Sequence, residues 1–164
     1  MNRFLFPFFS GLAGLGLAAA IAVTAGAKSA EAAKPVNPHV GIIEAVKAAG
    51  FTTHTDHQLC RENRNYYGFV YTPQRLYVIC FDNINNDTDI FRTIRHEAVH
   101  IMQWCNNGPI APFQSEAIVK RATDNGWNPD TYPASQLVTE AEARVFGDLM
   151  SAEEVVNHLN IHCN

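Results

Sequence analysis

The spacing of apolar residues changes along the chain and predicts a different element in each stretch. Residues 4–27 form one apolar run without a charged side chain. Further on, three stretches have apolar residues three or four positions apart, which predicts amphipathic helices: residues 39–49, 113–123 and 134–150. Ser151 and Glu154 form a capping box, which predicts that a last helix begins there and runs through residue 161.

Two shorter runs after the first predicted helix have the composition of strands. Residues 66–71 (YYGFVY) and 76–81 (LYVICF) are rich in aromatic and β-branched side chains. Residues 72–75, which include a proline, separate the two runs. This order predicts a β-hairpin.

A further helix is predicted after a polar turn that follows the hairpin. Its apolar stripe has helical spacing, so one side of the helix packs on a core: Ile94, Ala98, Ile101 and Cys105. Residues 87–89 (DTD) supply capping and first-turn acids at its start. Residues 107–109 (NGP) end it.

The apolar N-terminal run follows Arg3 and has the form of a secretory signal peptide. Cleavage could follow either of two A-x-A sites, at residues 25–27 and 30–32. An uncleaved anchor would need roughly 20 apolar residues, and the glycines and other small residues of the run favour cleavage instead. We therefore predict the following organisation: a signal peptide over residues 1–32, a linker over 33–38 and one folded domain over 39–164.

Charge and cysteine content narrow the class of protein. The formal net charge is −4 at pH 7 and no basic cluster is present, which argues against a nucleic-acid partner. An even number of cysteines in a small exported domain predicts two disulfides, and all four follow the signal: Cys60, Cys80, Cys105 and Cys163. Three pairings are possible. We predict Cys60–Cys80, which would brace the hairpin, and Cys105–Cys163, which would tie the C-terminus to the central helix.

The central helix carries the pattern H-E-x-x-H at residues 96–100. Residues four apart lie on the same face of a helix, so His96 and His100 can offer imidazole nitrogens to one metal ion. Glu97 lies one step round the helix, beside the ion rather than on it. A carboxylate in that place can take a proton from a water molecule.

On these residues the chain resembles the zincin superfamily of zinc metallopeptidases, and in particular small gluzincin-like domains. The resemblance implies that His96 and His100 bind one zinc ion per chain and that Glu97 is the general base. It also implies an α+β fold for residues 39–162: a helix, a short sheet, the metal helix and a C-terminal helical half. Zincins bind extended substrates along an edge strand, and residues 76–81 are our candidate for that strand.

A catalytic zinc ion needs a third protein ligand, and residues 139–144 (TEAEAR) are the best candidate stretch. This stretch resembles the E-x-x-A segment of gluzincins, which implies Glu140 as the ligand. Glu140 shares its helix face with Gly147, whereas Glu142 lies on an apolar face where a carboxylate needs a metal or a partner. We predict Glu140 and keep Glu142 as the alternative. Arg144 stands where many such families have an acidic or amide residue.

Together these features predict an exported zinc-dependent peptidase, secreted or periplasmic, that hydrolyses peptide or protein substrates. No stable membrane association is expected after signal cleavage. The alternative is a non-catalytic exported domain with a structural metal site or a partner-binding role. A fourth protein ligand would close the site and favour that alternative, and the candidates for it are His54, His57, His158 and His162. Tyr132 or a C-terminal histidine is a candidate to stabilise an oxyanion.

Overall fold

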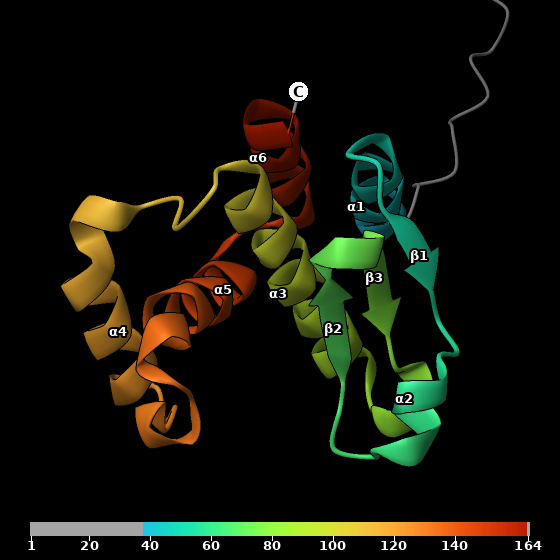
Figure 1. Ribbon diagram of the computed structural model, residues 1–164, viewed down its shortest axis with the longest axis horizontal. Coiled ribbons are helices and arrows are strands. Elements are labelled where there is room, and N and C mark those ends of the chain that lie inside the picture. Colours follow the sequence, from blue (N-terminus) through green and yellow to red (C-terminus); the bar gives the residue numbers. More distant parts are fainter. Residues whose placement is uncertain (1–37, 164) are drawn as a thin grey trace, which may run out of the picture. The chain divides into compact units, whose positions relative to one another are not determined.

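The computed structural model describes residues 38–163, which contain six α-helices and a three-stranded sheet (Figure 1). This confirms the predicted α+β fold class. The signal peptide predicted over residues 1–32 and residues 33–37 of the predicted linker lie outside the described residues. Within residues 38–163, no helix is both long enough and apolar enough to cross a membrane.

The sheet is formed by β1 (Thr52–His54), β2 (Gly68–Tyr71) and β3 (Leu76–Ile79). β2 and β3 pair antiparallel and form the predicted hairpin, although both strands are shorter than predicted. A single turn of 3-10 helix over Thr72–Gln74 joins them. Arg75 closes this turn in the left-handed conformation, with φ of 50°.

The prediction that residues 76–81 form an edge strand is wrong. β3 lies in the middle of the sheet, because β1 pairs with it in parallel on the side opposite β2. β1 consists of three residues, Thr-Thr-His, which is too short and too polar to give a strand pattern. The edge strands of the sheet are therefore β1 and β2.

The helix α3 (Asp87–Cys105) lies between the sheet on one side and α4 and α5 on the other (Figure 1). The side chain of Asn86 caps its start by accepting a hydrogen bond from the backbone N–H of Asp89 at 2.9 Å. Ile94, Ala98 and Ile101 of the predicted stripe are buried. The core of the domain therefore holds α3 along the side that the sequence predicted.

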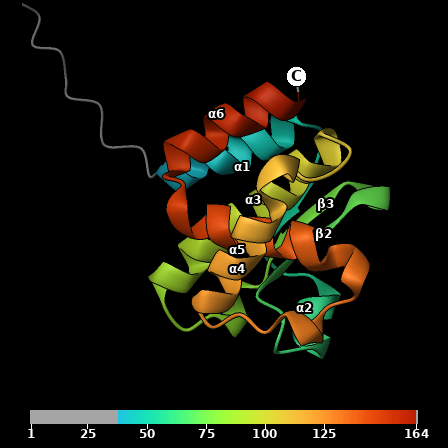
Figure 2. The ribbon, with the colours of Figure 1, turned by 90° about the vertical axis from the view of Figure 1, so that its left-hand side faces the viewer.

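Five further helices complete the described part of the domain. They are α1 (Pro38–Ala48), α2 (Gln58–Glu62), α4 (Ser115–Asp124), α5 (Leu137–Leu149) and α6 (Ala152–Cys163). α1 and α6 lie side by side (Figure 2), and both pack on α3. The predicted capping box is present, since Ser151 Oγ accepts from the Glu154 N–H and Glu154 Oε2 accepts from the Ser151 N–H.

α5 approaches α3 closely at Gly147. A Cβ atom at this position would lie 3.1 Å from both the backbone N and the Cα of His96. The absence of a side chain therefore lets the two helices approach closely. Such contact with backbone atoms leaves little room for relaxation.

Two disulfides have the predicted pairing. Cys60–Cys80 joins α2 to the residue after β3, and Cys105–Cys163 joins the last residues of α3 and α6. The second bond fixes the C-terminal helix to the helix that carries the H-E-x-x-H pattern.

Candidate metal centre

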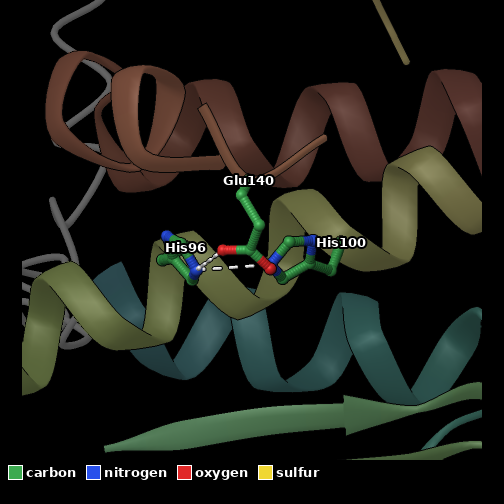
Figure 3. Close-up of side chains that lie close together, drawn as sticks. All are labelled: His96, His100 and Glu140. Carbon is green, nitrogen blue, oxygen red and sulfur yellow. Dashed lines mark hydrogen bonds and ion pairs between the residues drawn. The ribbon is translucent and has the colours of Figure 1, made fainter. Parts of the chain in front are cut away.

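Three potential ligand side chains meet between α3 and α5 (Figure 3). His96 and His100 project from the same face of α3, with their Nε2 atoms 3.2 Å apart. Glu140 reaches them from the first turn of α5, with Oε1 3.5 Å from His100 Nε2 and Oε2 3.8 Å from His96 Nε2. The structure thus brings the predicted third ligand to the two histidines.

The spacing of these atoms suits a small tetrahedral ion. Zinc lies about 2.0–2.1 Å from histidine nitrogens, so neighbouring ligand atoms in a tetrahedron are about 3.3–3.4 Å apart. The separations of 3.2, 3.5 and 3.8 Å lie around this value. The residues present therefore fit a zinc ion with small adjustments of the side chains.

Glu142, the alternative third ligand, points to a different set of partners. It is fully buried, and its carboxylate accepts hydrogen bonds from Gln103 Nε2 at 2.7 Å and from the backbone N–H groups of Ile110 at 3.0 Å and Ala111 at 2.7 Å. The apolar face on which it lies thus provides the partners that a buried carboxylate requires. Glu142 does not join the histidines.

Glu97 is buried between α3 and the edge strand β2, with 5% of its surface exposed. A Cβ atom on Gly68 would lie 2.9 Å from its Cγ and 3.0 Å from its Oε1. Burial, and next the Glu140 carboxylate, raise the pKa of Glu97 to about 8. A cation among the three ligand atoms would lower this pKa, because it stabilises the carboxylate form.

The two histidines are held by different groups. Burial, His100 and Arg144 lower the pKa of His96 well below its usual value, so this imidazole is neutral, as a metal ligand must be. The backbone of Ala143 hydrogen-bonds to it. His100 instead contacts a side chain, Gln103, with its Nδ1 2.8 Å from Oε1.

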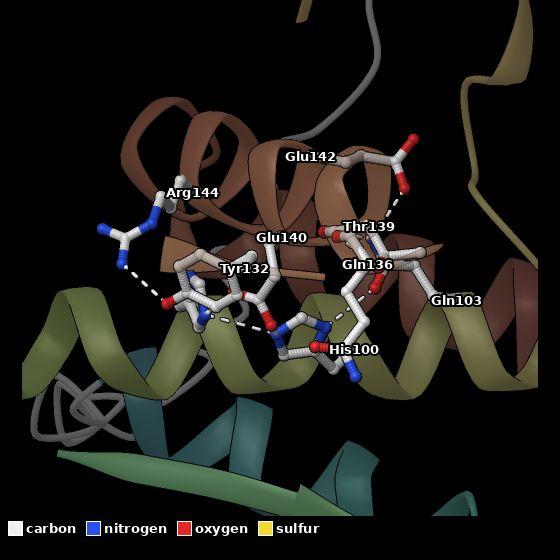
Figure 4. A network of polar contacts seen from close by, with 9 residues as sticks. His100, Gln103, Tyr132, Gln136, Thr139, Glu140, Glu142 and Arg144 are labelled. Atoms are coloured by element: carbon white, nitrogen blue, oxygen red, sulfur yellow. Dashed lines mark hydrogen bonds and ion pairs between the residues drawn. The ribbon is translucent and has the colours of Figure 1, made fainter. Parts of the chain in front are cut away.

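Two further polar side chains belong to the same network (Figure 4). Arg144 of α5 donates a hydrogen bond from Nη2 to the hydroxyl of Tyr132 at 3.3 Å. The positive charge of Arg144 is one of the causes that lower the pKa of His96. A cation and a hydroxyl are therefore available at this end of the site.

Within residues 38–163, no other three metal-ligating side chains come together. The centroids of the His54 and His57 rings are 6.3 Å apart, and those of His158 and His162 are 5.9 Å apart in a stacked pair. None of these four histidines joins the His96, His100 and Glu140 group. The acidic residues Glu116, Asp124 and Asp130 also lie outside it.

The sequence analysis did not identify Gln103. This side chain is 5% exposed and connects His100 to Glu142. A polar residue three positions after a ligand histidine faces the same way on a helix, and this was the available signal.

Comparison with known proteins gives one family. A family model described as a domain of unknown function (DUF8637) matches residues 33–164, which include every residue of the candidate site. No curated protein and no solved structure matches the chain.

Proposed function

The chain belongs to the DUF8637 family, and we propose from its candidate metal centre that it is an exported zinc-dependent peptidase. The observation that supports this function best is the meeting of His96, His100 and Glu140 beside the buried carboxyl group of Glu97. The resemblance to zincins implies the first three as ligands and Glu97 as the base, and the proximity of these four residues supports that proposal.

The donor set favours zinc over harder cations. Two imidazoles and one carboxylate suit zinc, whereas calcium and magnesium prefer oxygen ligands. Zinc bound by these residues would lower the pKa of a coordinated water and polarise a substrate carbonyl. Three protein ligands, with no fourth among the described residues, are typical of catalytic rather than structural zinc sites.

In the proposed reaction, Glu97 accepts a proton from the attacking water and passes it to the leaving amine. The position of Glu97 supports both transfers. It follows His96 directly on α3, and its buried side chain lies against Gly68 of β2. Burial also limits the access of bulk water to the transferred proton.

The position of β2 at the edge of the sheet favours a peptide as the substrate. β2 has β3 on one side and is the last strand of the sheet on the other. An extended peptide that paired with this free edge would lie beside Glu97, because Gly68 of β2 contacts the Glu97 side chain. The role first given to residues 76–81 thus passes to residues 68–71.

Tyr132 and Arg144 support the attack of the water on the substrate carbonyl. The Tyr132 hydroxyl accepts from Arg144 and keeps its own hydrogen for another acceptor. Donors of this kind stabilise the negative charge that develops on a carbonyl oxygen during attack. The two disulfides and the predicted signal peptide support export to an oxidising compartment, secreted or periplasmic.

The test is the metal content of the mature wild-type protein, measured by elemental mass spectrometry beside His96→Ala. We expect one zinc ion per wild-type chain, no stoichiometric zinc in the variant, and hydrolysis of a mixed peptide library by the wild type only. A folded, oxidised wild type without zinc would refute the metal site. A zinc ion without hydrolysis of any peptide would support the structural or partner-binding alternative.

The contact between β2 and Glu97 gives a prediction of its own. A methyl group in Gly68→Ala would lie 2.8 Å from Thr93 Cγ2 as well as 2.9 Å from Glu97 Cγ, so these side chains must move. Because proton transfer depends on position, we expect kcat to fall by about 10–100-fold. Zinc content should stay at the wild-type level, since no ligand atom is touched.

Gly41→Ala is the matched control for this substitution. Its Cβ would meet Val156 Cγ2 at 3.5 Å, an ordinary contact, and Gly41 lies in α1, where alanine is favourable. We expect wild-type kcat for this variant. Equal kcat values for the two alanine variants would show that β2 does not position Glu97.

A further inference from the structure

A chain of hydrogen bonds leads from His100 into the interior of the domain (Figure 4). His100 Nδ1 lies 2.8 Å from Gln103 Oε1, and Gln103 Nε2 lies 2.7 Å from Glu142 Oε2. Gln103 and Glu142 are both buried. The chain therefore connects a predicted zinc ligand on α3 to a buried carboxylate on α5.

The partners of Gln103 determine which way its amide points. Its Nε2 donates to Glu142 Oε2 and also to the backbone carbonyl of Thr139 at 2.9 Å. A carboxylate and a carbonyl only accept hydrogen bonds, so the NH2 group must face them. The amide oxygen is thereby left facing His100.

The amide orientation in turn determines the tautomer of His100. Gln103 Oε1 accepts a hydrogen bond, so the neutral imidazole carries its hydrogen on Nδ1. Its Nε2 then has a free lone pair, and this is the atom that faces His96 and Glu140. A metal ion requires that lone pair.

The position of Glu142 is itself fixed by the backbone. The N–H groups of Ile110 and Ala111, in the loop after α3, donate to its two oxygens at 3.0 and 2.7 Å. The resemblance to gluzincins placed an acidic or amide residue at position 144, where this chain has Arg144. Glu142 supplies an acidic group from a different position, and Gln103 carries its effect to the histidine.

We propose that Gln103 and Glu142 are positioning residues that hold His100 in the tautomer that ligates the metal ion. This inference rests on the proposed function, because the tautomer matters only if His100 binds a metal ion. The tautomer itself can be measured on the protein without metal. Outer hydrogen-bond partners of ligand histidines serve this purpose in metal sites generally.

The first test is the tautomer of His100 in the zinc-free, 15N-labelled protein at mildly alkaline pH, read from long-range 1H–15N NMR spectra. We expect the hydrogen on Nδ1 in the wild type and a shift of population toward Nε2 in Gln103→Met, which keeps the length of the side chain but cannot accept the bond. A wild-type His100 with its hydrogen on Nε2, or an unchanged tautomer in the variant, would overturn the proposal.

A second variant tests the carboxylate of Glu142, which ends the series of hydrogen bonds from His100. In Glu142→Met, no acceptor for Gln103 Nε2 remains at this position, so only the Thr139 carbonyl still favours the wild-type orientation of the Gln103 amide. Rotation of that amide, which would present a donor to His100, is therefore less costly than in the wild type. We expect the same shift of tautomer, and a zinc affinity about 10–100-fold below wild type in both variants, measured by chelator competition.

Thr139→Val is the matched control. The Thr139 hydroxyl donates to the Gln136 carbonyl and takes no part in the hydrogen bonds between His100 and Glu142. The backbone carbonyl of residue 139, which accepts from Gln103, remains in the variant. Wild-type tautomer and affinity are expected. The readouts separate the two proposals: a tautomer shift in a protein that hydrolyses no peptide would sustain this one alone, and hydrolysis with tautomer and affinity unchanged in both variants would sustain only the proposed function.

Discussion

Replacing Glu97 by glutamine is expected to lower peptide hydrolysis by about 10²–10⁴-fold, because the variant cannot accept the proton of the attacking water. The zinc content should not change, since Glu97 is not among the three proposed ligands. The fold should also persist. Burial raises the pKa of Glu97 to about 8, so in the metal-free protein at neutral pH the carboxyl group is mostly uncharged, as the amide is.

The measurement for this prediction combines kcat/KM on a peptide substrate with zinc content and thermal unfolding of the same sample. Glu44→Gln is the control, since Glu44 is an exposed acid of α1 that pairs with Lys47. It should retain wild-type activity. Activity of Glu97→Gln close to that of the control would show that another group is the base.

Glu140 and Glu142 of α5 are expected to differ in what is lost when each is replaced by alanine: zinc binding for Glu140 and stability for Glu142. In Glu140→Ala, the affinity for zinc should fall by more than the roughly 10–100-fold that follows loss of an outer hydrogen-bond partner. The stability of its metal-free form should change little, because the Glu140 side chain is 18% exposed and its removal also removes its repulsion of the Glu97 carboxylate.

Glu142→Ala should instead unfold more easily. It leaves the Ile110 and Ala111 N–H groups and the Gln103 amide without their acceptor, at a cost of about 2–5 kcal/mol. We expect it to retain zinc binding, although more weakly than wild type. Urea unfolding of the metal-free proteins and chelator competition of the loaded proteins measure both effects. A stable Glu142→Ala that has lost all zinc would reverse the assignment of the third ligand.

The strongest sequence signals were those with a short-range physical basis. The apolar stripe of α3 and the capping box at Ser151 depend on residues three or four apart, and both are present in the structure. The disulfide pairing was predicted although the paired cysteines are 20 and 58 residues apart, because each bond was chosen among three possible pairings for the predicted elements that it would brace.

Features that depend on contacts between distant residues were harder to predict. β1 has no strand pattern of its own and exists because β3 offers it a partner, so the order of the sheet was not visible in the sequence. Periodicity placed Glu140 and Glu142 on different faces of α5, but only the packing of α5 on α3 shows which carboxylate meets the histidines. Gln103 gains its role from Glu142, a residue far away in the sequence.

The two glycines that contact α3 have a consequence for recognising relatives. Gly147 contacts the backbone of His96 from α5, and Gly68 contacts the side chain of Glu97 from β2. H-E-x-x-H alone is a short pattern that also occurs by chance. A search that requires small residues at both glycine positions would select chains in which the pattern is packed as it is here, and reject those that carry it on an ordinary surface helix.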